Sequence, residues 1–249
     1  MQPGKSESSV ARFWDRESKD WGIKYGGSTS YFYRCRTFHE FFAAARLERA
    51  SILDYGCGSG DITFPMLHAG HTVTGVDIAQ GMVRKAAERA QQFGLSARAS
   101  YHLLDEAVLS RIAASTFDVV VCSSVLEYVD DDRSLLRMFH GVLRDGGYLL
   151  VSVPDRNSVY CRLDKWLYAH KRYLPRFVPV EKLAYLDIQK RQYDIAAFVR
   201  DVEAIGFALQ TKRHNTITLQ RGAIMEKFSN IPGIGMLGIM MFRKGSPGA

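Results

Sequence analysis

Short runs of β-branched and aromatic residues alternate with helical patterns between residues 51 and 153. The apolar runs that predict strands are SILDY, HTVTGVD, ASYHLL, FDVVVCS and GYLLVSV. Between them, residues 80–92 and 131–143 place apolar side chains three and four positions apart, which is the spacing of an amphipathic helix. This alternation of strand and helix is typical of an α/β fold built on a mostly parallel sheet.

Helical patterns flank and interrupt this region. Residues 10–47 are rich in aromatic side chains and arginine, and after residue 154 a helical stretch with apolar and basic positions replaces the strand pattern. A helix over 195–205 and strands near 207–212 and 236–243 then complete the alternation. We therefore expect an N-terminal helical lid over residues 1–48 and a core over 49–249, with a helical cap inserted at about 155–194.

The segment ILDYGCGSGDIT contains the strongest chemical signal. Gly56, Gly58 and Gly60 follow a buried-type strand at alternate positions, where glycine lets the backbone approach a ligand closely. Asp54 and Asp61 bracket the loop and would repel a pyrophosphate, whereas they would attract an ammonium or sulfonium centre. The loop therefore suits a cationic nucleoside better than a nicotinamide dinucleotide.

Two further acids end the following predicted strands. Asp77 in VTGVDIA is placed to accept both hydroxyls of a ribose, as the acidic residue of the dinucleotide fold does. Asp105 in YHLLDEA is placed to accept from an adenine amino group, although it can equally cap a helix. Ile78 and Met82 offer apolar faces for the purine ring, so we expect one ligand wall at the strand ends.

Four motifs in order carry a family resemblance. ILDYGCGSG, GVDIA, FDVVVCSSVLEYVDD and LRDGGYLLVSVP resemble those of the class I S-adenosylmethionine-dependent methyltransferases over about residues 40 to 210. The chain looks most like their small-molecule branch, related to the quinone-biosynthesis methyltransferases. The resemblance implies a Rossmann-like seven-stranded sheet, mostly parallel, with helices on both faces and a reversed last hairpin. It also implies S-adenosyl-L-methionine as cofactor, bound by Asp54, Gly56, Cys57, Gly58, Gly60, Asp77, Ile78, Met82, Asp105, Glu106 and Ser123.

The catalytic residues are less well indicated. Relatives often carry histidine in an LEHV motif after the fourth strand, but this chain has Leu126-Glu127-Tyr128-Val129. Tyr128 can hydrogen-bond a substrate, yet a tyrosine pKa of about 10 makes it a poor base at neutral pH. Glu127 and His214 are the alternatives for taking a proton from a hydroxyl, and all three residues can also be purely structural.

Aromatic residues in the flanking helices are candidates for the acceptor site. We assign Tyr25, Tyr160, Trp166 and Tyr193 to substrate binding. The cap alternates aromatic with basic side chains, so it is either a substrate lid or a helix that lies on an anionic membrane. We expect methyl transfer to a small aromatic or hydrophobic acceptor, at a hydroxyl oxygen. The alternatives are an RNA or N-methyltransferase, or a non-catalytic module that binds a membrane or protein.

Composition narrows these possibilities. With 249 residues, 47% of them hydrophobic, the chain can form one domain with a sizeable core. Its net charge of +7 is moderate, and no NPPY-type motif for a flipped base is present, so we expect no nucleic-acid partner. We expect a monomer or homodimer with peripheral membrane contact. Four scattered cysteines and no apolar signal segment indicate the cytoplasm, and no metal-binding constellation is evident.

Overall fold

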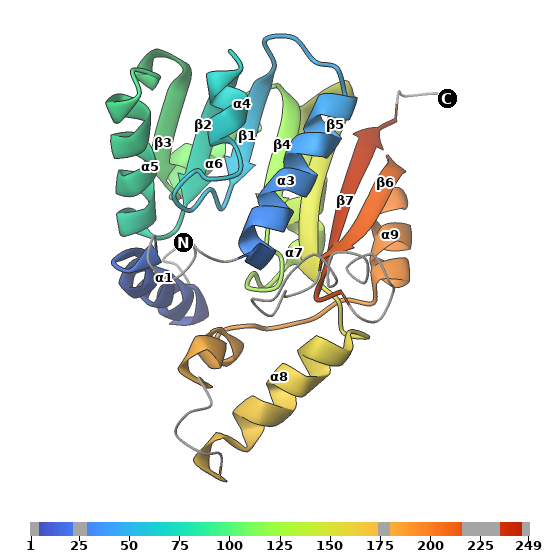
Figure 1. The fold of residues 1–249 in the computed structure, drawn as a ribbon. Coiled ribbons are helices and arrows are strands. Elements are labelled where there is room, and N and C mark those ends of the chain that lie inside the picture. Colours follow the sequence, from blue (N-terminus) through green and yellow to red (C-terminus); the bar gives the residue numbers. More distant parts are fainter. Residues whose placement is uncertain (1–4, 22–28, 174–179, 216–234, 246–249) are drawn as a thin grey trace.

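The computed structural model describes residues 5–21, 29–173, 180–215 and 235–245. A seven-stranded sheet forms its centre, in the order β3-β2-β1-β4-β5-β7-β6 (Figure 1). The strands are β1 Ser51–Tyr55, β2 Thr72–Asp77, β3 Ala99–Leu103, β4 Phe117–Ser123, β5 Leu143–Pro154, β6 Phe207–Asn215 and β7 Leu237–Lys244. The expected Rossmann-like α/β fold is therefore confirmed.

Strand direction follows the expected pattern. β1 to β5 pair in parallel, whereas β7 runs antiparallel to both of its neighbours, β5 and β6. β7 is thus the reversed member of the last hairpin, and β6 points the same way as β1. In the centre of the sheet, residues 119–122 of β4 are fully buried because helices cover both faces.

Two helical layers enclose the sheet. On one face lie α3 Thr29–Ala44, α4 Phe64–His68 and α5 Gln80–Gln92, and on the other α6 Glu106–Ala113, α7 Asp132–Val142 and α9 Ile195–Glu203. A 3₁₀ turn, η1 Ser96–Arg98, leads into β3. Each layer forms its own apolar cluster with one face of the sheet.

The remaining helices gather beyond the carboxyl ends of the parallel strands. These are α1 Lys5–Ser18, α8 Val159–Ala169 and the short 3₁₀ helices η2 Lys171–Tyr173 and η3 Val180–Asp187. α1 and α8 lie below the sheet in the view of Figure 1, so the described helices within 155–194 lie at this edge, and their role as an inserted cap remains a prediction.

The N-terminal segment 1–48 does not behave as one unit. Phe38, Phe41 and Phe42 of α3 are buried in the core cluster against the sheet, because their spacing of three and four positions puts them on one face of the helix. α1 lies at the carboxyl edge of the sheet, where it packs against α5. A lid function therefore remains a prediction, and among the described residues it concerns α1 and the residues that join it to the sheet.

Candidate active site

The glycine loop joins the end of β1 to the neighbouring strand. Gly56 donates its backbone N–H to the Val76 carbonyl at 2.8 Å, and Gly56, Gly58 and Gly60 all have positive φ. A Cβ on Gly56 would lie 2.1 Å from a methyl carbon of Val125, whereas a Cβ on Gly58 would meet no atom within 4 Å. Glycine is therefore required both for the backbone angles and to let the loop after β4 approach.

Two buried carboxylates stand behind this loop. Asp77 is 9% exposed and accepts the N–H groups of Gly58 and Ala79, each at 2.9 Å, while burial raises its pKa. Asp54 is 2% exposed, and burial raises its pKa to about 7 although the Thr63 hydroxyl donates to it at 2.6 Å. A positively charged ligand is favoured at this edge, because it would stabilise both carboxylates in their charged form.

The structure places the other expected cofactor residues around the same edge. Cys57 and Met82 are buried, Ile78 is half-buried, Glu106 is exposed at the start of α6, and the Ser123 hydroxyl lies 3.0 Å from that of Ser152. Asp105 is exposed and caps α6 by accepting the Val108 N–H at 2.7 Å. Its capping role is thus present, and a contact with adenine remains a prediction.

Aromatic side chains from the N-terminal helices lie against the glycine loop. Trp21 Nε1 and the Tyr31 hydroxyl donate to Asp61 Oδ2 at 3.1 and 2.9 Å. Burial alone would raise the pKa of Asp61, but these bonds, the Ser59 hydroxyl and the Arg89 charge together lower it. The ring of Trp14 packs edge-on against Tyr128 at 5.7 Å. These aromatic side chains therefore cover the glycine loop at Asp61 and the loop after β4 at Tyr128.

α1 is docked by a contact that the sequence did not indicate. Asp15 Oδ1 accepts the backbone N–H of Gly81 at 2.6 Å, at the beginning of α5. A Cβ on Gly81 would lie 2.3 Å from the Ser18 hydroxyl oxygen, so only glycine allows this approach. Because Gly81 precedes Met82, α1 reaches the segment expected to contact the purine.

Glu127 lies in the loop after β4 and is 2% exposed. Burial raises its pKa to about 8, against the charge of Arg34, which lowers it. Arg34 donates to the Ser124 hydroxyl at 2.9 Å, and Ser124 has a positive φ of 54°. Among the described residues, Glu127 Oε2 and Arg34 Nε are buried with no hydrogen-bond partner. Nothing local in the sequence distinguishes Arg34 from Arg36, the other arginine of its helix.

The remaining catalytic candidates lie at different distances from the glycine loop. Tyr128 is half-buried beside Glu127. His214 lies near the end of β6. Because β6 is three strands from β4 in the sheet, the backbones of these two strands are roughly 14 Å apart. Its Nδ1 is 3.8 Å from Asp155 Oδ2, and burial lowers its pKa. Glu127 is therefore the buried candidate in the loop that contacts the glycine loop through Val125.

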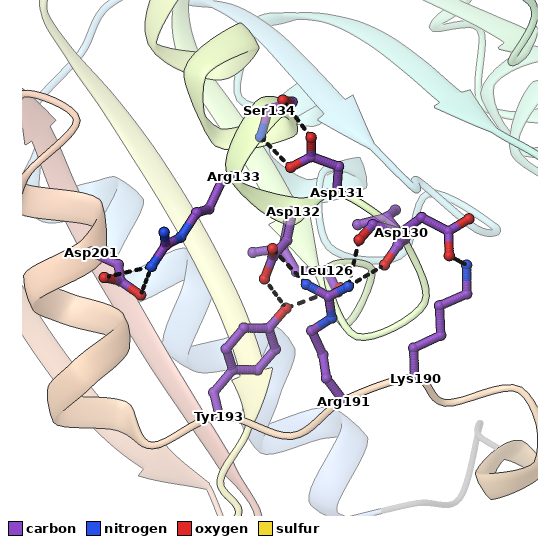
Figure 2. Close-up of polar contacts among 11 residues, drawn as sticks. Leu126, Asp130, Asp131, Asp132, Arg133, Ser134, Lys190, Arg191, Tyr193 and Asp201 are labelled. Atoms are coloured by element: carbon purple, nitrogen blue, oxygen red, sulfur yellow. Dashed lines mark hydrogen bonds and ion pairs between the residues drawn. The ribbon is translucent and has the colours of Figure 1, made fainter.

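The expected acceptor residues do not form one cluster. Tyr193 shares its hydroxyl proton between Asp132 Oδ2 at 2.8 Å and the Leu126 carbonyl at 3.0 Å (Figure 2). Trp166 is 54% exposed and stacks on His170, and Tyr160 is half-buried at the start of α8. Tyr25 lies outside the described residues. α8 buries Cys161 and turns Trp166 to the surface, so the expected contact of Trp166 with the acceptor remains a prediction.

Within the described ranges, His, Cys, Asp and Glu side chains form no group of three or more that could hold a metal ion. None of the helices in those ranges has the length and apolar composition needed to cross a bilayer.

Similarity to known proteins points the same way as the geometry. The model of a methyltransferase-domain family matches residues 29–211. A ubiquinone biosynthesis O-methyltransferase from Escherichia coli O7:K1 is 28% identical over 238 residues, covering 92% of this chain and 88% of the relative.

Solved structures share the fold across nearly the whole chain. Magnesium protoporphyrin IX methyltransferase from Synechocystis PCC 6803, with bound S-adenosylhomocysteine, has a TM-score of 0.67 and 16% identity, covering 96% of this chain and 99% of its own. The 1,6-didemethyltoxoflavin-N1-methyltransferase of Burkholderia thailandensis has a TM-score of 0.65 and 15% identity, covering 99% and 92%.

Proposed function

The chain belongs to the methyltransferase-domain family and is an S-adenosylmethionine-dependent methyltransferase of small molecules. We propose that it methylates a hydroxyl oxygen of a hydrophobic aromatic molecule. The observation that carries this proposal is the buried Glu127 carboxyl in the loop that touches the glycine loop. Methyl transfer to a hydroxyl requires a group that takes the hydroxyl proton, whereas transfer to a neutral amine does not require one before attack.

The residues of the glycine edge fit the cofactor. When bound, S-adenosylmethionine supplies a methyl group on a positively charged sulfur that is already a good leaving group. Asp77 would hold the ribose hydroxyls, the backbone from Gly56 to Gly60 and the Asp54 carboxylate would hold the methionine portion, and Arg34 would hold its carboxylate. Open space at Gly58 and the two buried acids support this assignment.

Glu127 has the properties of a general base for a phenolic hydroxyl. A catalytic base works best when its pKa lies near the working pH, and burial raises the pKa of Glu127 to about 8. Because its Oε2 has no partner among the described residues, that atom can accept the acceptor's hydroxyl proton. His214 lies beside Asp155 on the last hairpin and not in the loop that contacts the glycine loop, and Tyr128 follows Glu127 as a hydrogen-bond donor.

The name of the relative supports oxygen as the methylated atom. That protein is a ubiquinone biosynthesis O-methyltransferase, and the similarity extends over nearly the whole chain. We therefore favour a hydrophobic phenol or catechol over an amine or an RNA as the methyl acceptor. A non-catalytic module is not favoured, because the glycine loop, Asp77 and Glu127 are all in place.

The test uses a panel of alkylated phenols and catechols with matched anilines as acceptors. We expect methylated product from the hydroxyl compounds, measured by mass spectrometry. Glu127→Gln should lower kcat on a phenol by about 10²–10⁴-fold, while S-adenosylhomocysteine still binds by calorimetry. Glu88→Gln, an exposed change on α5, is the control. Methylation of anilines alone, or full activity of Glu127→Gln, would overturn the proposal.

We also propose that the enzyme works in the cytoplasm and touches a membrane surface through α8. Val159, Leu163 and Trp166 recur on one helical face and are 62%, 46% and 54% exposed. Arg162 and Lys165 are exposed beside this face. An exposed apolar stripe with a basic rim fits an anionic bilayer, from which a hydrophobic acceptor could be drawn.

A further inference from the structure

The end of the inserted cap is tied to the loop that carries Glu127. We call residues Lys190–Tyr193, which join the cap to α9, the strap (Figure 2). The backbone N–H of Lys190 donates to the Glu127 carbonyl at 2.8 Å. Arg191 Nη2 donates to the carbonyls of Val129 and Asp130 at 3.1 and 2.6 Å. The strap therefore satisfies backbone acceptors on Glu127 itself and on residues two and three positions further along.

Side chains reinforce this contact at the start of α7. Arg191 Nη1 lies 2.6 Å from Asp132 Oδ1, and the Tyr193 hydroxyl donates to the other oxygen of the same carboxylate at 2.8 Å. The Tyr193 backbone N–H donates to the Pro154 carbonyl at 2.9 Å, at the end of β5. The strap is thus hydrogen-bonded to the end of β5, and it contacts the Glu127 loop on both sides of Glu127, at Leu126 and at Asp132.

We propose that Arg191 and Tyr193 are positioning residues that hold the Glu127 carboxyl in its buried place, in the loop that contacts the glycine loop through Val125. This inference rests on the proposed role of Glu127 as the base. The strap is the last part of the inserted cap, which is expected to contact the acceptor. The same segment therefore also positions the Glu127 carboxyl, which takes the proton of the acceptor's hydroxyl.

The surroundings of Glu127 explain what loss of the strap should do. Arg34 from α3, Cys122 from β4, Tyr185 from η3 and Tyr193 from the strap are the titratable groups that interact with it, and only Arg34 carries a charge at neutral pH. Freeing the loop admits water to the carboxyl. Water stabilises the charged form, so the pKa of Glu127 should fall toward its ordinary value.

The first experiment compares Arg191→Met with Arg133→Met. Arg133 lies on the neighbouring helix and pairs with exposed Asp201 instead of the strap, so it is a matched control (Figure 2). We expect Arg191→Met to lower kcat by about tenfold and to move the acidic limb of the kcat profile about one pH unit lower. S-adenosylhomocysteine affinity should stay within about twofold. Arg133→Met should behave as the parent does.

A second measurement reads Glu127 without turnover. The protein is labelled with ¹³C at the glutamate carboxyls, and the NMR signal that disappears in Glu127→Gln is assigned to Glu127. If Arg191→Met does not fold, Tyr193→Phe is the second strap variant, because it removes only one hydroxyl. The Glu127 titration should move to lower pH in either strap variant. A fall in kcat with an unmoved titration would overturn the positioning role. Full activity of Glu127→Gln would instead overturn the proposed base while leaving the titration result interpretable.

Discussion

Asp77 combines two tasks at the end of β2. Its two oxygens accept the N–H groups of Gly58 and Ala79, which hold the glycine loop to the neighbouring strand, and each oxygen can accept one further bond. The expected ribose contact therefore adds to a structural role. Asp118 offers a comparison at the opposite edge of the sheet, where its Oδ2 accepts the Ser51 N–H at 2.7 Å.

Replacing Asp77 tests its expected contact with the ribose of the cofactor. Asp77→Ala should weaken S-adenosylhomocysteine binding by roughly ten- to a hundredfold, because buried ribose hydroxyls would lose their acceptor. Asp118→Ala removes a comparable carboxylate away from the site, and its affinity should equal that of the parent. Calorimetric titration of the two folded variants decides the matter; equal affinities in both would mean that Asp77 does not hold the cofactor.

At the scale of elements, α1 and α8 occupy the carboxyl edge by different means. α1 is fixed through Asp15 on the beginning of α5, with Val10 buried. α8 packs through Cys161 and contacts η3, which leaves its Val159, Leu163 and Trp166 face exposed. The first arrangement suits a lid over the cofactor, and the second suits contact with another surface.

The exposed face of α8 leads to a prediction in vesicle flotation. Leu163→Ala combined with Trp166→Ala should reduce binding to phosphatidylglycerol vesicles by about tenfold, since both side chains would lose apolar burial. Leu109→Ala, which removes a comparably exposed side chain from α6, should change nothing. Raising the salt concentration should weaken the part of binding that depends on Arg162 and Lys165. Failure of the parent to float with anionic vesicles at low salt would refute the membrane contact.

Over the whole molecule, buried acids collect at one edge of the sheet. Asp54, Asp77, Glu127 and Asp155 lie at or just after the carboxyl ends of four different strands, and each is less than a tenth exposed. Burial raises the pKa of Asp54 to about 7 and that of Glu127 to about 8. Their charging therefore opposes folding in the absence of a cationic ligand, which is the cost of preparing the site.

The pH dependence of stability should reveal this cost. Glu127 holds its proton up to a pH of about 8 in the folded state but loses it near 4.5 when unfolded. Between these values the folded state binds more protons, so the free energy of unfolding should fall as pH rises, by up to about 1.4 kcal/mol per pH unit. Denaturant titrations at pH 5 and 8 should show this fall in the parent relative to Glu127→Gln. Parallel values for the two proteins would contradict it.

The sequence by itself determined the sheet and the cofactor edge. Runs such as FDVVVCS and the loop from Gly56 to Gly60 are local patterns, because an apolar run and alternate glycines can be recognised within a short stretch of sequence. Because parallel strands end at one edge, placing Asp54 and Asp77 together needed only the strand assignments. The helices over 80–92 and 195–203 were likewise readable from apolar spacing.

Only the tertiary structure decided which side chains meet there. Arg34 and Ser124 are 90 positions apart, and Arg191 and Asp130 are 61 apart, so no local pattern encodes either contact. Tyr193, expected at the acceptor, proved to hold the Glu127 loop, and α8 turned the stripe of Trp166 outward because its neighbour covers only one side. Periodicity identifies an apolar face, but what covers that face depends on the packing of segments distant in sequence.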